Sequence, residues 1–509
     1  MIVPGTESPG VATVPDSSLG RSGWLVVGTL MLATVLANIA SVCMFPQSVA
    51  LSEEFRRPVN QVVWTMTSFH LVATGIGGVA AALGAILGNR RMLIVTMGLL
   101  CIGSLIAAFA NDLPVLIAGR ILQGVCMATQ AIAIGIIAHN WRGEAMRRAM
   151  SMMILAIGLG AVIAYVLSGL IWRSGGTWRT MFWILFAGSA LDILLIVSLV
   201  KETWRARGVR VDYVGCLGLV LWSALVLLPV SQANSWGWGS AEVLGLLLPG
   251  VALLVLWVFW EIRCREPLID LRVLGRPGVW QGGVVWLTLI MGVIVPAAAM
   301  PFLIQTPTAS GFGFGGNMFV VSLALGATAA VMVVVSPFAA PLMRKVGARR
   351  TMLIGLLTGL SGFGLAFAHG SLWLTFVWLG ALGIPGALAG SASYAVAAEA
   401  VTPRQGLQVG TVYATAANTG AAVSSAIVGY VLTLRHVTVP VTPAGGAETQ
   451  IFPADATYTW AALIVGAMAL VGTVAVLSIK ATGSCALTPA QQPKTRAGQD
   501  LEFDAPGPE

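Results

Sequence analysis

The sequence predicts an all-α integral membrane protein, and three observations support this: its composition, its long apolar runs and the placing of its basic residues. Hydrophobic residues occupy 57% of the 509 positions and charged residues only 9%, a balance unlike that of soluble globular proteins. Apolar runs long enough to cross a bilayer follow one another along the chain. The net charge of +8 comes from basic residues in short loops, which membrane insertion explains better than an anionic partner.

Fourteen apolar runs are predicted to span the bilayer. Six begin near Trp24, Gln61, Met92, Leu113, Met150 and Trp178, two cover 211–231 and 241–261, and six begin near Val279, Asn317, Thr351, Ser371, Val409 and Tyr458. An even number places both termini on one side of the membrane. The loops and tails on that side hold most of the 28 Lys and Arg residues, so the positive-inside rule predicts cytosolic termini.

These runs divide the chain into five parts. We expect a flexible tail over residues 1–22, a six-helix bundle over 23–200, a linker with two spans over 201–278, a second six-helix bundle over 279–480 and a cytosolic tail over 481–509. An internal repeat supports two related bundles. The repeat is clearest in two turns. Gly88, Arg90 and Arg91 in the turn after the second span correspond to Gly347, Arg349 and Arg350 in the turn after the tenth span.

One arginine, Arg120, stands inside the apolar run over 113–139, roughly 10 Å from its first end. At such a depth an arginine costs about 2.5–3.5 kcal/mol, so it usually faces the protein interior or a wet cavity. Gln123 and Gly124 share its helix face, which favours a cavity. The alternative is an arginine whose long side chain reaches back to the membrane surface.

Proton coupling needs a group that changes charge inside the membrane, and two residues qualify. His70 lies about 14 Å along the second predicted span, and Asp192 lies about 13 Å from the cytosolic end of the sixth. Either could instead be structural. The same alternative holds for polar and aromatic residues that could receive an amphipathic ligand: Asn38, Gln47, Gln130, Gln305, Tyr394, Tyr413 and Asn418.

Several motifs carry a family resemblance. The R-x-x-Q-G pattern from Arg120 to Gly124 is similar to the fourth-helix motif of the major facilitator superfamily. Further segments resemble its fourteen-helix drug:proton antiporter family: Trp178, Arg179 and Phe182, then Glu261 with Pro267 to Asp270. The resemblance implies the major facilitator fold, with 14 transmembrane helices in two six-helix bundles plus an inserted two-helix hairpin.

Three motifs of that family are degenerate in this chain. The first span keeps Pro46 but lacks the acid that precedes it in the family. The turn after the second span keeps Gly88, Arg90 and Arg91 without its acid, and in the fifth span Tyr165 replaces the usual proline. The antiport signature is therefore weaker than the resemblance in fold.

Small residues lie four apart along the fifth span, at Gly160, Ala164 and Ser168, with Gly169 next. Such rows let helices approach closely. The resemblance implies that this helix and its repeat-related partner form a sliding seam between the bundles. Plain structural packing is the alternative, and the two are compatible.

We therefore expect a secondary active transporter that exports small hydrophobic or amphipathic organic compounds, as in multidrug efflux and antibiotic resistance, by proton antiport with alternating access. A facilitated or differently coupled metabolite transporter of the same fold is one alternative, and a non-transporting membrane receptor or immunity protein is another. No nucleotide-binding loop, catalytic triad or metal cluster is evident.

We accordingly expect no enzymatic activity, no cofactor and no metal. The resemblance implies a multi-pass protein of a bacterial plasma (inner) membrane, acting as a monomer. Its partners would be a small-molecule substrate, protons and the lipid bilayer, without nucleic acid.

Overall fold

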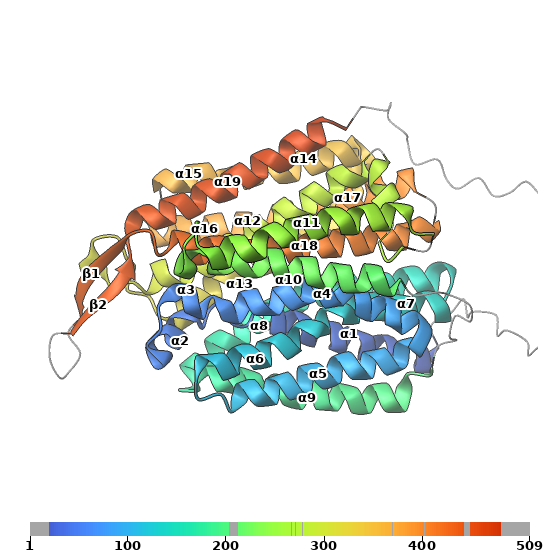
Figure 1. The fold of residues 1–509 in the computed structure, drawn as a ribbon, viewed down its shortest axis with the longest axis horizontal. Coiled ribbons are helices and arrows are strands. Elements are labelled where there is room, and N and C mark those ends of the chain that lie inside the picture. Colours follow the sequence, from blue (N-terminus) through green and yellow to red (C-terminus); the bar gives the residue numbers. More distant parts are fainter. Residues whose placement is uncertain are drawn as a thin grey trace, which may run out of the picture.

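Two groups of helices lie side by side in the computed structural model, one from each half of the chain (Figure 1). The structure describes residues 20–202, 212–265, 267–269, 271–276, 278–368, 370–401, 403–441 and 448–479. Most of the two predicted tails and residues 203–211 of the linker lie outside these ranges. The expectation of flexible tails therefore stays a prediction.

The first group contains the six spans predicted before the linker, several of them interrupted. The fourth span is two helices joined by a 3-10 turn, and the first continues past Pro46 into a short separate helix. The elements are α1 (Arg21–Val42), α2 (Ser48–Phe55), α3 (Val59–Val62), α4 (Trp64–Leu87), α5 (Asn89–Ala108), α6 (Leu113–Gly124), η1 (Val125–Ala128), α7 (Thr129–Asn140), α8 (Gly143–Arg173) and α9 (Trp178–Leu199).

A hairpin of two helices follows, α10 (Tyr213–Trp236) and α11 (Ala241–Arg263), and α10 packs against both α4 and α18. The remaining elements form the second group. They are η2 (Leu271–Gly275), α12 (Val279–Gln305), η3 (Thr308–Ser310), α13 (Met318–Val346), α14 (Ala348–Gly359), α15 (Ser361–Ala368), α16 (Leu372–Ala381), α17 (Gly383–Ala400), α18 (Pro403–Val431), β1 (His436–Val441), β2 (Glu448–Pro453) and α19 (Asp455–Leu477).

The strands β1 and β2 form an antiparallel hairpin in which His436 pairs with Pro453. This hairpin lies at the end of the molecule opposite the last turn of α19 (Figure 1). It connects α18 to α19.

Eleven helices in the described part of the chain are long and apolar enough to cross a membrane. The three other predicted spans coincide with α4, with α14 and α15 together, and with α18. Leu360 separates α14 from α15, which leaves two pieces of 12 and 8 residues. The protein is thus a multi-pass helical membrane protein.

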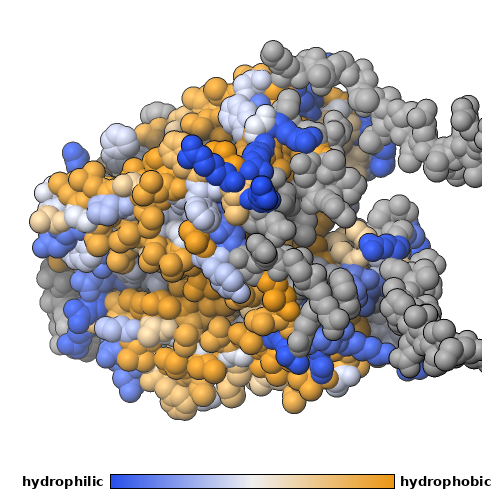
Figure 2. All heavy atoms as spheres, turned by 45° about the vertical axis from the view of Figure 1, so that its right-hand side comes forward, coloured by the Kyte–Doolittle hydropathy of each residue, from blue (hydrophilic) through white to orange (hydrophobic). Residues whose placement is uncertain are grey.

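The outer surface of the helices is apolar. Large side chains such as Leu194, Leu248 and Trp373 are more than half exposed. Figure 2 shows a broad band of hydrophobic residues on the face it displays, with hydrophilic residues gathered toward the ends. Such a band suits contact with lipid, whereas a soluble monomer rarely exposes so large an apolar surface.

The two halves repeat a contact at corresponding positions. Arg90, at the start of α5, donates to the Val197 carbonyl oxygen near the end of α9 at 2.6 Å. Arg349, at the start of α14, donates to the Leu477 carbonyl oxygen at the end of α19 at 2.9 Å. Carbonyls in the last turn of a helix lack intrahelical donors, so each arginine caps a neighbouring helix. These equivalent arginine contacts in the two halves agree with the predicted internal repeat.

Glycines bring α5 and α6 unusually close. A Cβ atom at Gly103 would lie 2.6 Å from the Gly119 carbonyl oxygen, and one at Gly119 would lie 2.7 Å from the Gly103 carbonyl oxygen. Neither position can hold a larger residue without a shift of backbone. This contact fixes the position of α6, which carries Arg120.

Replacing Gly103 by alanine should therefore destabilise the protein by about 1–3 kcal/mol. Gly98→Ala is the matched control, because it lies in the same helix with nothing within 4 Å of the new methyl group. Alanine favours a helix by about 1 kcal/mol over glycine, so the control should keep or raise stability. Tryptophan fluorescence of detergent-solubilised protein gives the unfolding midpoints. Equal midpoints for the two variants would contradict the close contact of α5 with α6.

Candidate functional site

Arg120 is fully buried and joins three helices. Its Nε atom donates to the Thr65 carbonyl oxygen of α4 at 2.8 Å. Its Nη1 atom donates to the Ala40 carbonyl oxygen of α1 at 2.8 Å and to Oε1 of Gln123 at 2.6 Å. Hydrogen bonds to charged groups contribute about 1.5–3 kcal/mol each. These bonds therefore tie α1, α4 and α6 together inside the membrane.

The position of Ala40 explains why its carbonyl is available. Ala40 lies in the last turn of α1, which ends at Val42 shortly before Pro46. Carbonyls there lack intrahelical donors and form the negative end of the helix dipole. A cation is stabilised at such an end. The guanidinium thus meets negative potential without a carboxylate among its recorded partners in the described chain.

The residues predicted to share the Arg120 face support it from both sides. Gln123 also connects Arg120 to α5, because its Nε2 atom donates to Oγ of Ser104 at 2.8 Å. Gly124 lets α4 approach, since a Cβ atom there would lie 2.5 Å from the Phe69 carbonyl oxygen. The Phe69 ring lies 4.4 Å from the guanidinium carbon. The R-x-x-Q-G pattern is thus a site of helix packing around a buried charge.

Arg120 does not reach the membrane surface, so the snorkelling interpretation is wrong. Neither of the two cavities described below is lined by Arg120, Gln123 or Gly124, so the expectation that their shared face lines a cavity stays a prediction. Its Nη2 atom has no hydrogen-bond partner among the described residues. Nη2 is therefore the nitrogen of Arg120 that can still donate a hydrogen bond to a further partner.

His70 lies next to this network, at the boundary of the two groups of helices. It is 3% exposed on α4, and neither ring nitrogen has a recorded hydrogen bond in the described chain. Its polar neighbours are Arg120, which acts on it through charge, and Asn418 of α18. The ring also stands edge-on to Phe69 at 5.2 Å between centroids. His70 thus connects the Arg120 cluster to the second bundle.

Asp192 is equally buried but lies elsewhere. It is fully buried in α9, which packs against α5 and α1, and neither carboxyl oxygen has a partner among the described residues. No contact of α9 with the second bundle is among the principal helix contacts of the described chain. Asp192 therefore does not share the boundary on which His70 lies.

The most extensive contacts between the two bundles join α4 with α18 and α8 with α13. On α8, Cβ atoms at Gly158 and Gly169 would contact Val333 and Ser322 of α13 at 2.6 and 3.1 Å. A Cβ atom at Gly326 of α13 would lie 3.6 Å from Cβ of Tyr165. Tyr165 and Gly169, both expected to take part in packing, thus face the second bundle together with Gly158.

Gly160, the first residue of the predicted row at spacing four, packs within the first bundle. A Cβ atom there would lie 2.7 Å from Cβ of Asn38 on α1. Ala164 and Ser168 are fully buried. The seam role expected of this row stays a prediction.

The remaining predicted polar residues do not form one site. Asn38 and Asn418 donate to carbonyl oxygens of their own helices, at Thr34 and Ala414. Gln130 is half-buried on α7 with no recorded partner in the described chain. Tyr413 donates to the Val279 carbonyl oxygen at 3.1 Å and stacks near Tyr394 at 5.1 Å.

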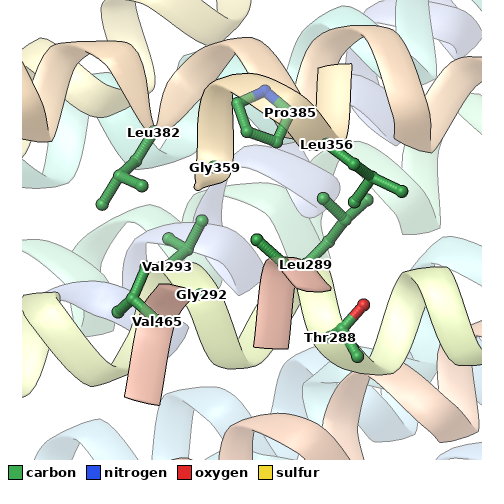
Figure 3. Close-up of a pocket in the computed structure, with 10 residues that line it drawn as sticks. Thr288, Leu289, Gly292, Val293, Leu356, Gly359, Leu382, Pro385 and Val465 are labelled. Carbon is green, nitrogen blue, oxygen red and sulfur yellow. The ribbon is translucent and has the colours of Figure 1, made fainter. Parts of the chain in front are cut away.

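One cavity lies inside the second bundle between α12, α14, α17 and α19. Figure 3 shows apolar side chains around it, with the Thr288 hydroxyl as a polar group. Its volume of about 20 Å³ is roughly the space of one water molecule. It cannot hold an organic substrate, so it is a packing void.

A larger cavity of about 340 Å³ lies where α2 and α8 of the first bundle meet the second. It is lined by Val49, Glu53, Trp172, Gln305, Pro307, Gly316, Asn317, Met318 and Phe452. Of the predicted residues only Gln305 is among them. Sequence reasoning missed the others because no pattern links segments so far apart, and only the fold brings them together.

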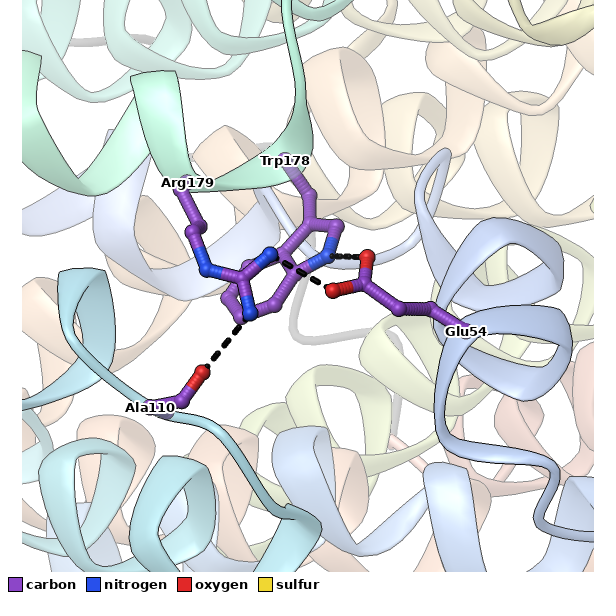
Figure 4. Close-up of polar contacts among 4 residues, drawn as sticks. All are labelled: Glu54, Ala110, Trp178 and Arg179. Carbon is purple, nitrogen blue, oxygen red and sulfur yellow. Dashed lines mark hydrogen bonds and ion pairs between the residues drawn. The ribbon is translucent and has the colours of Figure 1, made fainter.

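Trp178 and Arg179, quoted above for a motif, hold α2 against the first bundle (Figure 4). Arg179 donates to Oε1 of Glu54 at 2.6 Å and to the Ala110 carbonyl oxygen at 2.9 Å. The Trp178 indole donates to Oε2 of Glu54. The motif therefore stabilises the end of the first bundle and positions the neighbouring residue, Glu53.

The arginine-rich turns also act within their own bundles. Arg91 forms an ion pair of 3.5 Å with Glu202, which follows α9. Gly88 and Gly347 take positive φ angles of 103° and 87°, which glycine adopts without strain. Arg350 is exposed. Among the described residues no group of three His, Cys, Asp or Glu side chains is placed to hold a metal ion.

Known proteins resemble this chain in sequence. An uncharacterised MFS-type transporter of Bacillus subtilis, YcnB, is 27% identical over 65% of this chain and 69% of its own length. A uridine/deoxyuridine transporter of Lactococcus lactis is 26% identical over 72% of this chain and 78% of its own length. A multidrug resistance protein B homolog of Mycobacterium tuberculosis is 26% identical over 67% and 63%.

Solved structures resemble it in fold. A mutant of the peptide transporter POT in complex with sulfate superposes with a TM-score of 0.63 at 13% identity, covering 89% of this chain and 93% of that one. The family profile of the Major Facilitator Superfamily matches residues 30–319 and 282–501, which together include both bundles and the Arg120 network. The chain belongs to the Major Facilitator Superfamily.

Proposed function

We propose that this transporter exports small hydrophobic or amphipathic organic compounds in exchange for protons. It would span the plasma membrane of a bacterium fourteen times, as a monomer, with both termini in the cytosol. Residues 23–200 and 279–480 would move as two bodies, and 201–278 would carry the inserted hairpin. Substrate would pass between the bundles, which expose it to either side in turn.

The observation that carries this proposal is the position of His70. It is the titratable side chain that lies between the Arg120 cluster and Asn418 of α18, and it is 3% exposed. Imidazole changes charge near physiological pH when free in water. A group that can gain a proton at the boundary of two moving bodies is what coupling requires.

Because Arg120 is close to His70, protonation of His70 would change how the helices pack. Protonation of His70 places a second positive charge near Arg120, which is permanently charged. Like charges in a site of low dielectric constant repel strongly. The repulsion would act between α4 and α6, shift the surface that α4 presents to α18 and so favour the alternative arrangement of the bundles. Loss of the proton to the other side would reverse the change.

Asp192 is the second candidate for the proton. A buried carboxyl without a recorded partner is a functional suspect within a membrane. Its position on α9, away from the helices that join the bundles, favours a structural role instead. We therefore assign coupling to His70 and leave Asp192 as the comparison.

Drug efflux finds support in the similarity to the multidrug resistance protein B homolog. A facilitated or differently coupled metabolite transporter is the alternative, and the relative that transports uridine and deoxyuridine favours it. The missing acid of the first span favours it too. Arg120 opposes a receptor without transport, because such a protein has no need of a buried charge between moving bundles.

The test is transport in proteoliposomes with and without an imposed pH gradient, over a panel of lipophilic cations and neutral antibiotics. The gradient should accelerate export of at least one compound by about tenfold. His70→Ala should abolish this acceleration while gradient-independent exchange persists, and Asp192→Asn should retain it. Uncoupled transport in the wild type would support the facilitated alternative.

The comparison of the two variants decides the proton carrier. Acceleration lost in Asp192→Asn and kept in His70→Ala would move coupling to α9. If both variants keep it at equal reconstituted amounts, a buried carrier at either position is wrong. Size-exclusion profiles of both variants show whether either has misfolded.

The orientation can be tested by labelling single cysteines in a cysteine-free background. Ile451, 70% exposed on β2, should react with an impermeant maleimide in intact cells when replaced by cysteine. Lys345→Cys, at the opposite end of the molecule on α13, should react only after permeabilisation. The reverse pattern would refute cytosolic termini.

A further inference from the structure

The cavity of about 340 Å³ between α2, α8, α12 and β2 has the composition of a ligand site. Phe452 of the β hairpin lines it, and this hairpin lies at the end of the molecule opposite the last turn of α19 (Figure 1). Its volume is at the lower end of the ~300–1,000 Å³ of small-molecule sites. Both bundles contribute to its walls, so a molecule leaving the path between them would meet it.

Glu53 supplies the negative charge of this cavity. No ion pair or hydrogen bond of its carboxylate is recorded in the described chain, whereas the adjacent Glu54 is held by Arg179 and Trp178. Partial burial raises the pKa of Glu53 above its ordinary value. A cation bound beside this carboxylate would offset the cost of that burial. Arg173, which follows the lining residue Trp172, lies over the Phe319 ring, with its guanidinium carbon 5.8 Å from the ring centroid.

Two amides offer complementary groups. Nε2 of Gln305 donates to the Pro301 carbonyl oxygen at 3.2 Å, so its Oε1 atom is left as an acceptor. Oδ1 of Asn317 accepts from the backbone nitrogen of Val320 at 3.2 Å and caps α13, so its Nδ2 atom is left as a donor. The Glu53 carboxylate and the Gln305 oxygen together suit a ligand with N–H donors.

The remaining wall is apolar and partly aromatic. Trp172 at the end of α8 is 42% exposed, and Phe452 reaches the cavity from β2. Val49 and Met318 complete the apolar surface. Aromatic faces attract organic cations by about 0.5–2 kcal/mol and also bury their hydrocarbon parts.

We propose that this cavity binds small organic ammonium ions with an aromatic or aliphatic body. The ammonium group lies against Glu53 and the Gln305 oxygen, and the body lies against Trp172 and Phe452. The inference deepens the proposed function, because it names amines as a class of exported compound and places their last contact before release.

Binding is measured on the detergent-solubilised full chain at neutral pH with three probes that share one body: phenylbutylamine, phenylbutanol and phenylbutyrate. Microscale thermophoresis gives their dissociation constants. The amine should bind at least fivefold more tightly than the alcohol, and the acid should bind most weakly. Glu53→Gln should remove the preference for the amine while affinity for the alcohol stays within about twofold.

Two further variants keep the test sharp. Trp172→Leu should weaken the amine and the alcohol together, since both lose the aromatic face. Glu242→Gln, a matched change at the exposed start of α11 and outside the cavity, should leave the preference intact. Equal affinity of the wild type for the three probes, or an equal loss in Glu242→Gln, would overturn the site.

Because no gradient or transport is involved, this result is separable from the proposed function. Amine preference that depends on Glu53 would stand even if proteoliposomes showed no export. Proton-driven export of amines combined with unchanged amine affinity in Glu53→Gln would overturn this site alone.

Discussion

The structure depends on how one positive charge is accommodated within the membrane. The Arg120 guanidinium donates to the Ala40 carbonyl oxygen at the end of α1, to the Thr65 carbonyl oxygen of α4 and to the amide oxygen of Gln123. The end of α1 at Val42 leaves the first of these acceptors without its intrahelical donor, and the approach of α4 past Gly124 supplies the second. The negative end of α1 offers the potential that an acid would otherwise provide. The lost acid of the first span therefore need not leave the charge unbalanced.

This arrangement links the interior of the first bundle to its boundary. The Arg120 guanidinium lies over the ring of Phe69. The next residue, His70, has Asn418 of the second bundle as a polar neighbour. Along the other pair of helices, small residues of α8 meet α13. The boundary between α4 and α18 thus holds a titratable group, and at the boundary between α8 and α13 small residues let the two helices pack closely.

Much of the fold could be predicted from the sequence because hydrophobic length and basic loops determine membrane spans. The face shared by Arg120, Gln123 and Gly124 also followed from helical spacing. The breaks at η1 and Leu360 were not predicted, although Gly124 precedes the first and Gly359 and Gly362 flank the second. The pairing of His70 with Asn418 and the gathering of Glu53, Trp172 and Phe452 depend on tertiary packing between distant segments. Spacing along one helix carries no information about such contacts.

The measurement that tests the central claim most directly is transport by Arg120→Lys at equal membrane abundance. A lysine offers one ammonium in place of a planar fork, so it cannot reach the acceptors on α1, α4 and α6 at once. The account predicts a transport rate reduced at least tenfold together with a lower unfolding midpoint. Arg148→Lys, an exposed change on α8, should alter neither. A wild-type rate in Arg120→Lys would contradict the claim that the guanidinium holds the transport machinery together.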